Sequence, residues 1–137
     1  TVDVQGTIEE FFDLTELTGA TIVSQTPGDG TLPFMPTLVL PSEVASGGAM
    51  AEARESMLLR VENVAISNQN PDAPEDFDEF ELDGLRVDDF LFDALDNMCI
   101  EGSSFTAVQG VLTYSFGDFK LAPRSAGDFE GGSCMPF

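Results

Sequence analysis

The best candidate for site chemistry in this sequence is an acidic run between residues 68 and 79. Counted from its first residue, oxygen-bearing side chains stand at the first, third, fifth, ninth and twelfth positions, and they are Asn68, Asn70, Asp72, Asp76 and Glu79. This is the ligand spacing of a calcium loop, and Ca²⁺ prefers carboxylate and carbonyl oxygens. Against a true EF-hand, Ala73 replaces the turn glycine and no helical pattern flanks the run. A Ca²⁺ site and a solvated acidic loop both stay open.

A second acidic cluster follows, within a stretch at 88–98 that the pattern predicts to be a short helix. Asp89, Asp93 and Asp96 would share one face of that helix, at i, i+4 and i+7. The opposite positions would then point inward, and they are Phe90, Leu91, Ala94 and Leu95. A self-repelling face of this kind either attracts a cation or is simply solvated, and we favour the solvated face.

Catalysis has little support in the composition. The chain contains no histidine, so the Ser-His-Asp triad, the Cys-His pair and the commonest general base are all missing. Pairs of carboxylates can hydrolyse glycosides, but 25 acidic residues in 137 produce close pairs by chance. We therefore expect a protein that is not an enzyme.

The net charge of −20 further narrows the possible partners. Only five residues are basic, so neither a phosphate backbone nor an anionic membrane finds enough Lys and Arg to bind. With 42% apolar residues and twelve Phe, the charge sits on a folded body, and divalent cations would relieve its self-repulsion. General nucleic-acid binding is not expected. Neither is membrane insertion, since the longest apolar-leaning run, 31–42, is short and broken by prolines.

The location of the protein is predicted from its two cysteines, Cys99 and Cys134. A disulfide between them would tie down the C-terminal tail and would stabilise the fold by about 4 kcal/mol on the chain-entropy model. Such a bond suits an oxidising, extracellular location. The alternative, two free thiols in a cytosolic protein, is the less favoured interpretation.

Alternating apolar and polar residues predict a mostly β protein. The predicted strands cover residues 2–12, with Gly6 at a bulge, then 21–25, 57–67, 80–87 with a turn at Asp83-Gly84, 105–116 and 119–121. Residues 49–56 are the best helix candidate, and Ser42 is a candidate cap for a shorter one. A turn at 27–30 and a proline-punctuated connector at 31–41 join the first strands to the rest.

One stretch recurs within the chain. Val4-Gln5-Gly6 returns as Val108-Gln109-Gly110, an offset of 104, and the register continues with Phe12 against Phe116 and Leu17 against Leu121. Chance and a true partial repeat are both open. If the repeat is real, the chain opens with the closing strands of one β unit and then supplies a fuller second unit.

Three segments carry a resemblance to a known fold: 55–64, 80–89, and 105–129 with its Leu-Ala-Pro-Arg-Ser-Ala ending at 121–126. Together they resemble an OB-fold domain of the kind found in large secreted bacterial proteins, some attached to extracellular nucleases and phosphoesterases. The resemblance covers about residues 49–130. It implies an OB-like five-stranded barrel with one or two short helices, at 42–137, and an extra N-terminal β segment with a connector, at 1–41.

Two functions follow as expectations. The first is a non-catalytic, extracellular, calcium-stabilised structural subunit, a homo-oligomer or homopolymer whose neighbours pair strands through Val2, Val4 and Ile8. The second is an accessory module of a secreted nuclease or phosphoesterase that binds a nucleic acid or a glycan. OB-folds commonly bind such ligands on their strands and loops, but the acidic loops of this chain oppose the nucleic-acid part.

Overall fold

The computed structural model describes residues 1–12, 14–28 and 35–137, and it divides the chain into two compact units. The first unit is Thr1–Met35 and the second is Pro36–Phe137, and each is described by itself. The predicted turn at 27–30 and the predicted connector at 31–41 lie partly outside the described residues. Strand β3 (Thr37–Leu38), which the predicted boundary at residue 41 assigns to the first part, pairs with the second unit instead.

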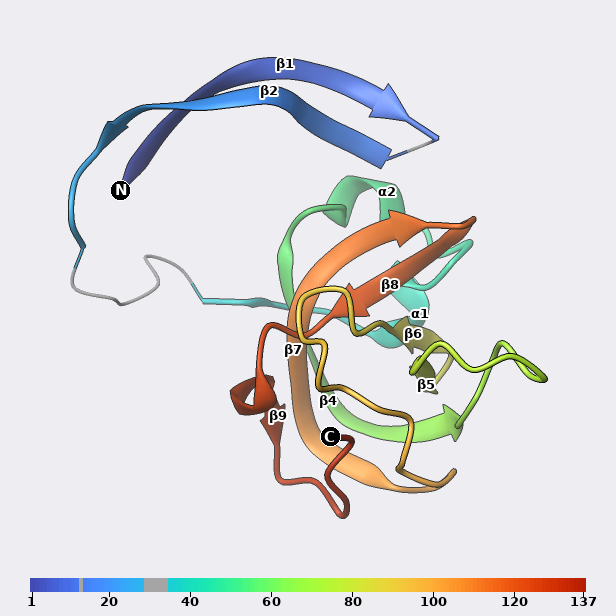
Figure 1. Cartoon of the computed structure of the whole chain (residues 1–137). Helices are drawn as coiled ribbons and strands as arrows, with labels where there is room; N and C mark the ends of the chain where they lie inside the picture. The colour runs from blue at the N-terminus through green and yellow to red at the C-terminus, as the bar shows by residue number, and fades with distance from the viewer. Residues whose placement is uncertain (13, 29–34) are drawn as a thin grey trace. The chain divides into compact units, whose positions relative to one another are not determined.

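The second unit is a closed five-stranded barrel with OB-like topology (Figure 1). Its strands pair in the order β4-β5-β6-β8-β7, and β7 returns to pair with β4. All these pairs are antiparallel except β6–β8, which is parallel. Strands β3 and β9 extend the sheet at its two ends. The five barrel strands are β4 (Leu58–Asn68), β5 (Phe80–Leu82), β6 (Leu85–Val87), β7 (Ser104–Ser115) and β8 (Asp118–Ala122), and the added strand β9 is Phe129–Glu130. The predicted fold class is confirmed.

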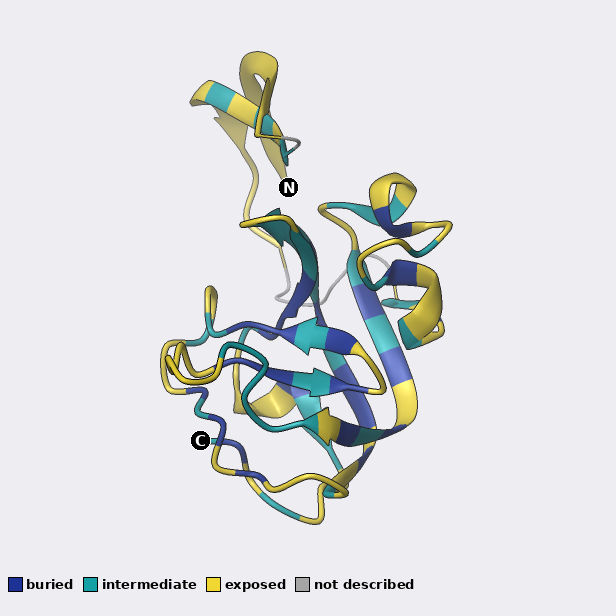
Figure 2. Cartoon of the chain, turned by 90° about the vertical axis from the view of Figure 1, so that its right-hand side faces the viewer, coloured by how far each residue is buried: buried dark blue, intermediate teal, exposed yellow. Residues whose placement is uncertain are grey.

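Alternating side chains fill the barrel. In β4, Leu59 and Val61 are fully buried, while Arg60 between them lies on the outer face. Figure 2 shows this alternation as dark blue and lighter segments along the long strands. The period of two is what the pleat of a strand imposes, so the sequence pattern predicts these strands well. The largest fully buried side chains are Phe80, Phe105, Leu59, Leu82, Leu85, Leu95, Leu112, Leu121, Val44, Val61, Val64 and Val87.

A tight turn joins β5 to β6, as the sequence predicts. Asp83 and Gly84 both have positive φ, 48° and 87°, the conformation of a two-residue type I′ hairpin turn. The turn matters because it fixes which face each side chain of the short hairpin takes. Leu82 and Leu85 pair directly and face the core, so Arg86 falls on the opposite face.

The helices are short, and the predicted cap of the first one is wrong. Helix α1 (Pro41–Val44) begins with a proline, and the Glu43 carboxylate accepts the Leu40 N–H, so Ser42 is not the cap. Helix α2 (Ala51–Arg54) lies inside the predicted 49–56. Among the described residues, no helix is long and apolar enough to cross a membrane.

Residues 88–98 do not form the predicted helix. Instead, short turns follow one another, with the Asp88 carboxylate accepting the Phe90 N–H. Of the four side chains predicted to point inward, only that of Leu95 is buried. Four aspartates in nine residues explain the failure, because Asp is a poor helix former and carboxylates at i, i+4 repel each other.

The C-terminal tail is fixed by the disulfide between Cys99 and Cys134, so that prediction is confirmed. The two Cα atoms lie 6.0 Å apart and are separated by 35 positions in sequence. Beside the bridge, the Phe137 ring packs on Phe92 and on Phe129. A 3₁₀ turn, η1 (Ala126–Asp128), precedes β9.

The first unit is an antiparallel hairpin of β1 (Val2–Phe11) and β2 (Leu14–Gln25). The second strand is longer than the predicted 21–25, because residues 14–20 continue the same extended pairing. The predicted bulge is confirmed, since the pairing register shifts between Gln5 and Thr7, around Gly6. Almost all side chains of this hairpin are exposed within its own unit, as Figure 2 shows.

Candidate functional site

The barrel carries a cavity of about 780 Å³ on one side. Its walls come from the loop between β4 and β5, from the end of β6 with the residues after it, and from the turn between β7 and β8. In the order of OB strands, these are the loops after the first and the fourth strands, where OB-folds hold their ligands. The lining residues are Asp72, Phe77, Asp78, Glu79, Arg86, Asp88, Asp89, Phe90, Ser115, Phe116, Asp118 and Lys120.

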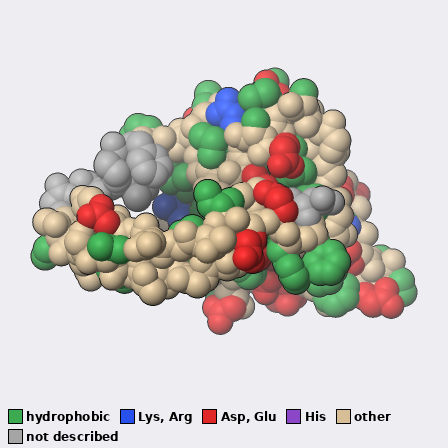
Figure 3. Space-filling view, turned by 90° about the horizontal axis from the view of Figure 1, so that it is seen from above, with side chains coloured by type: hydrophobic (Ala, Val, Ile, Leu, Met, Phe, Trp, Pro, Cys, Tyr) green, Lys and Arg blue, Asp and Glu red, His purple; other side chains and the backbone are tan. Residues whose placement is uncertain are grey.

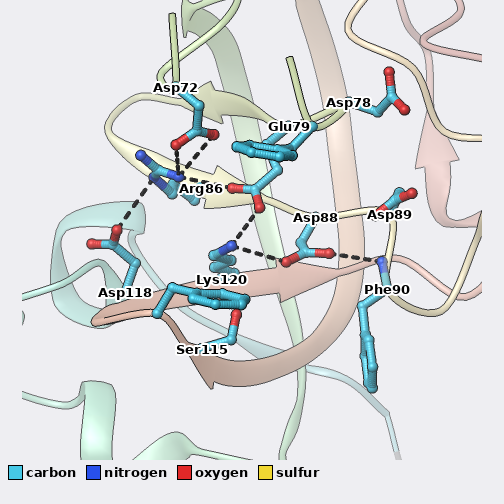
Figure 4. Close-up of a pocket in the computed structure, with 12 residues that line it drawn as sticks. Asp72, Asp78, Glu79, Arg86, Asp88, Asp89, Phe90, Ser115, Asp118 and Lys120 are labelled. Atoms are coloured by element: carbon cyan, nitrogen blue, oxygen red, sulfur yellow. Dashed lines mark hydrogen bonds and ion pairs between the residues drawn. The ribbon is translucent and has the colours of Figure 1, made fainter. Parts of the chain in front are cut away.

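Lys120 forms the centre of the cavity floor (Figure 4). Its side chain is buried, and its ammonium group donates to Glu79 and lies 3.2 Å from the Asp88 carboxylate. Burial is the largest single influence on Lys120, and it lowers the pKa. The hydrogen bond to Glu79 and the charge of Asp88 act in the opposite direction and together outweigh it. The net result is a raised pKa, so Lys120 is a fixed positive charge and not a general base.

Arg86 is the second basic residue of the floor. Its Nη1 donates to Asp72 and to Glu79, at 2.9 Å each, and its Nε lies 3.5 Å from Asp118. Burial alone lowers the pKa of this guanidinium, and the hydrogen bonds to Asp72 and Glu79 more than compensate. Glu79 therefore bridges the two basic residues, which locks the floor into one network (Figure 4).

The cavity nevertheless has an excess of negative charge. Six of its lining residues are acidic and two are basic, a difference of four, and both basic residues are already ion-paired. The pKa of Asp89 is raised, first by burial and then by the nearby charges of Asp88 and Asp78. A carboxylate in this position is destabilised in its charged form, so the cavity favours a positive charge beside it.

Three phenylalanine rings lie on the walls of the cavity and are largely exposed. Phe116 is 100% exposed, Phe90 is 72% exposed and Phe77 is 60% exposed. Phe116 lies in the β7–β8 turn with a φ of 53°, and its ring centroid lies 5.9 Å from the Lys120 ammonium. Exposed rings gathered at a cavity are typical of a binding site, because burying them needs a partner.

The five predicted calcium ligands are scattered among other partners. The Asp72 and Glu79 carboxylates bind Arg86, and the Asp76 carboxylate accepts from the Asn97 amide. Asn68 and Asn70 each accept a backbone N–H two residues further on, which makes them turn residues. In the described part of the chain, no three Asp, Glu or Cys side chains gather closely enough to hold a metal ion.

In this arrangement the five residues do not form a coordination shell. A cation would first have to displace Arg86 and Lys120 from Asp72 and Glu79, at the cost of a buried ion pair. Calcium binding at 68–79 stays a prediction.

Sequence reasoning missed the two basic residues of the floor, although one signal pointed to Lys120. That residue stands between Phe119 and Leu121, in a strand whose neighbours are apolar. A lysine there is either exposed on an edge or buried with an acidic partner. Its partner, Glu79, is 41 residues away, and no local pattern connects the two.

The hairpin β1–β2 is a second candidate site, because its pairing register repeats that of β7–β8. Ile8 pairs with Leu17 as Leu112 pairs with Leu121, and adding 104 to each number of the first pair gives the second. The other four residue pairs of β1–β2 in this stretch, from Thr7–Thr18 to Phe11–Leu14, have counterparts in β7–β8 at the same offset. The offset also relates two closely packed glycines, Gly6 and Gly110. A Cβ on Gly6 would meet Leu17 and Thr18, and one on Gly110 would meet Leu121 and Ala122.

The apolar side chains of the two hairpins differ sharply in burial. Leu112 and Leu121 are 0% exposed in the barrel, whereas within the first unit Ile8 is 73% exposed and Leu17 is 48% exposed. Val2 and Val4, the other two residues predicted to mediate self-association, are about half exposed. All three predicted residues therefore lie on β1 and are accessible within their own unit.

Comparisons of the chain with known protein families, with characterised proteins and with solved structures find no match.

Proposed function

We propose that the protein is a non-catalytic, extracellular structural subunit that assembles with other copies of itself by strand pairing. The observation that carries this proposal is the N-terminal hairpin, whose register matches the closing hairpin of the barrel while its core-type side chains lie exposed. The hairpin has the form of the last two strands of a barrel.

Burial of the hairpin's apolar face supplies the driving force. A two-stranded hairpin alone is marginally stable in water, because it has no layer to pack against. Covering Ile8 and Leu17 to the extent seen for Leu112 and Leu121 would contribute about 2 kcal/mol for each side chain. Self-assembly gives these side chains a core that their own unit lacks.

Strand pairing has an available edge. In the barrel, β7 pairs with β8 on one side and with β4 on the other. Among the described residues, β1 pairs with β2 alone, so the edge that corresponds to the β4 side of β7 is open. Open edges of this kind bind further strands by β-augmentation, and a neighbouring copy is the proposed source of that strand.

One further observation supports an extracellular location, and another concerns how copies would assemble. The Cys99–Cys134 disulfide is of the kind that persists in oxidising compartments. The net charge of −20 keeps separate copies apart in solution, which fits an assembly governed by specific pairing and not by general stickiness. On the face seen in Figure 3, acidic side chains stand at many points and basic ones at few.

The test compares three forms of the chain by sedimentation velocity and electron microscopy. Ile8→Asp places a charge on the face that corresponds to the barrel core, and it should abolish the oligomers or fibres formed by the parent chain. Thr7→Asp adds the same charge to the opposite face of β1 and should leave assembly intact. Deletion of Thr1 to Thr18 should act as Ile8→Asp does.

The melting temperature of the barrel should be the same in all forms, because the second unit contributes its own core. An Ile8→Asp chain that still forms the parent assemblies would rule out the hairpin as the contact. A parent chain that stays monomeric at all concentrations would rule out self-assembly altogether.

A second candidate function is supported by the cavity. Its volume of about 780 Å³ lies in the range of small-molecule sites, and it sits between the loops that OB-folds use for binding. On this view the barrel is a ligand-binding module, and the two functions can coexist because they use different residues.

A further inference from the structure

We propose that the cavity binds a small organic cation, a substituted ammonium ion with an apolar body, in contact with its phenylalanine rings. The inference rests on the second candidate function, binding at the cavity, and it assigns the class of ligand. It is independent of the hairpin and of self-assembly.

The rings define the first requirement on the ligand. Phe77, Phe90 and Phe116 together present a large apolar surface to a cavity of small-molecule size. The face of an aromatic ring carries a negative quadrupole, so it attracts cations, and substituted ammonium ions are the best attested ligands of aromatic walls. The ligand therefore combines apolar surface with positive charge.

The charge of the floor defines the second requirement. Four lining carboxylates, those of Asp72, Glu79, Asp88 and Asp118, neutralise the charges of Arg86 and Lys120 with two negative charges in excess. Asp78 and Asp89 add two more, and they lie on the side of the cavity away from Arg86 (Figure 4). An anion such as a nucleotide or phosphate finds no basic group that is not already ion-paired.

A bare metal ion fits the same charge poorly. In the described part of the chain, no three lining carboxylates converge closely enough to coordinate a metal ion. Three of the lining residues are phenylalanines, whose rings are not metal ligands. An organic cation needs no coordination shell. It requires only a ring face and a carboxylate in the same cavity, and Phe116 and Asp89 both line it.

The test uses the full-length chain carrying Ile8→Asp, which is expected to stay unassembled and does not alter the cavity. Its matched pair of probes is choline and the uncharged isostere 3,3-dimethylbutan-1-ol. Amide shifts in two-dimensional NMR report binding at the cavity residues. Choline should bind about tenfold more tightly than the isostere, as a cation–π contact beside a carboxylate implies. Added NaCl should weaken choline binding and leave the isostere unaffected.

Two variants and two controls locate the site. Phe116→Ala and Asp89→Asn should each weaken choline binding about fivefold. Phe12→Ala is the control for the first, because Phe12 is the repeat counterpart of Phe116, is exposed, and shares a positive φ. Asp93→Asn is the control for the second, since Asp93 is exposed and does not line the cavity. Neither control should change the affinity.

The outcomes separate the failure of the inference from that of the ligand-binding function. Equal affinity for choline and its isostere, or preferential binding of a short oligothymidylate, would overturn the assigned class while leaving the cavity a ligand site. Binding of an oligolysine peptide without any binding of choline would indicate a basic protein partner in place of a small ligand. That result would also overturn the assigned class. Unperturbed cavity amides with every probe would overturn both the inference and the ligand-binding function.

Discussion

At the scale of single residues, the cavity floor depends on one buried lysine. Lys120 holds Glu79 and Asp88 together, and Glu79 in turn holds Arg86. Removing one partner from a buried ion pair leaves an uncompensated charge, which costs far more than the intact pair contributes. The network is therefore expected to be sensitive to loss of the lysine and tolerant of changes at its exposed rim.

Lys120→Met tests this sensitivity. The substitution keeps the length of the side chain but leaves the buried Glu79 and Asp88 without their ammonium partner, so the free energy of unfolding should fall by about 3 kcal/mol. Arg60→Met is the control, because its partners Glu62 and Glu130 are exposed, and it should cost less than about 1 kcal/mol. Urea denaturation measures both, and equal losses would contradict a buried network.

Asp89 gives a pH-dependent prediction. Its pKa is raised above the ordinary value of 3.8, so at neutral pH the folded protein carries a charge that its surroundings disfavour. Asp89→Asn should raise the melting temperature by about 2 °C at pH 7. The gain should vanish at pH 3, where the carboxyl group is protonated in both the folded and the unfolded state. A gain that persisted at pH 3 would exclude the charge of Asp89 as its cause.

At the scale of elements, the closing hairpin of the barrel is the unit that repeats. The two copies, β1–β2 and β7–β8, share a turn with a phenylalanine at positive φ and a glycine at the same distance from that turn. The glycine lets its strand approach the partner closely. In the barrel this closeness is needed to bend β7, which pairs with both β4 and β8.

Gly110→Ala tests that requirement. The new Cβ would lie 2.7 Å from the Ala122 carbonyl oxygen and 2.8 Å from Leu121, too close without a shift of the backbone. The free energy of unfolding should therefore fall by about 2 kcal/mol. Gly127→Ala is the matched control, because its nearest neighbour, the Ser125 side chain, is at 3.5 Å. Thermal melts compare the two variants. An unchanged melting temperature for Gly110→Ala would mean that β7 and β8 can move apart enough to admit the new Cβ without loss of stability.

At the scale of the whole molecule, the disulfide and the charge act in opposite directions. The net charge of −20 destabilises any compact state through self-repulsion, whereas the disulfide restricts the unfolded chain. The bridge also fixes the tail on which Phe137 packs against Phe92. The stability of this barrel is therefore expected to depend on its redox state.

Replacement of both Cys99 and Cys134 by alanine should lower the free energy of unfolding by about 4 kcal/mol, from the 35-residue separation of the two positions. The melting temperature should become insensitive to added dithiothreitol, while that of the parent chain should fall on reduction. A parent chain whose melt does not change on reduction would show that the loop entropy is not what stabilises the fold.

Much of the fold could be predicted from the sequence, because its signals are local. The alternation of apolar and polar residues in 57–67 predicts β4 directly, and the Asp83-Gly84 pair predicts the turn that follows β5. The recurrence at an offset of 104 left chance and a partial repeat both open, and the matching registers of β1–β2 and β7–β8 favour the partial repeat. Period-two burial and left-handed turns need no information from distant residues.

Only the tertiary structure decided what the acidic residues do. The spacing at 68–79 is that of a calcium loop, yet Asp72 and Glu79 bind basic residues from β6 and β8 that lie up to 41 positions away. The predicted helix at 88–98 likewise gave way to turns around buried Leu95 and Cys99. A carboxylate has no preferred partner in sequence. It takes the cation that the closed barrel brings within reach, and that choice depends on long-range packing alone.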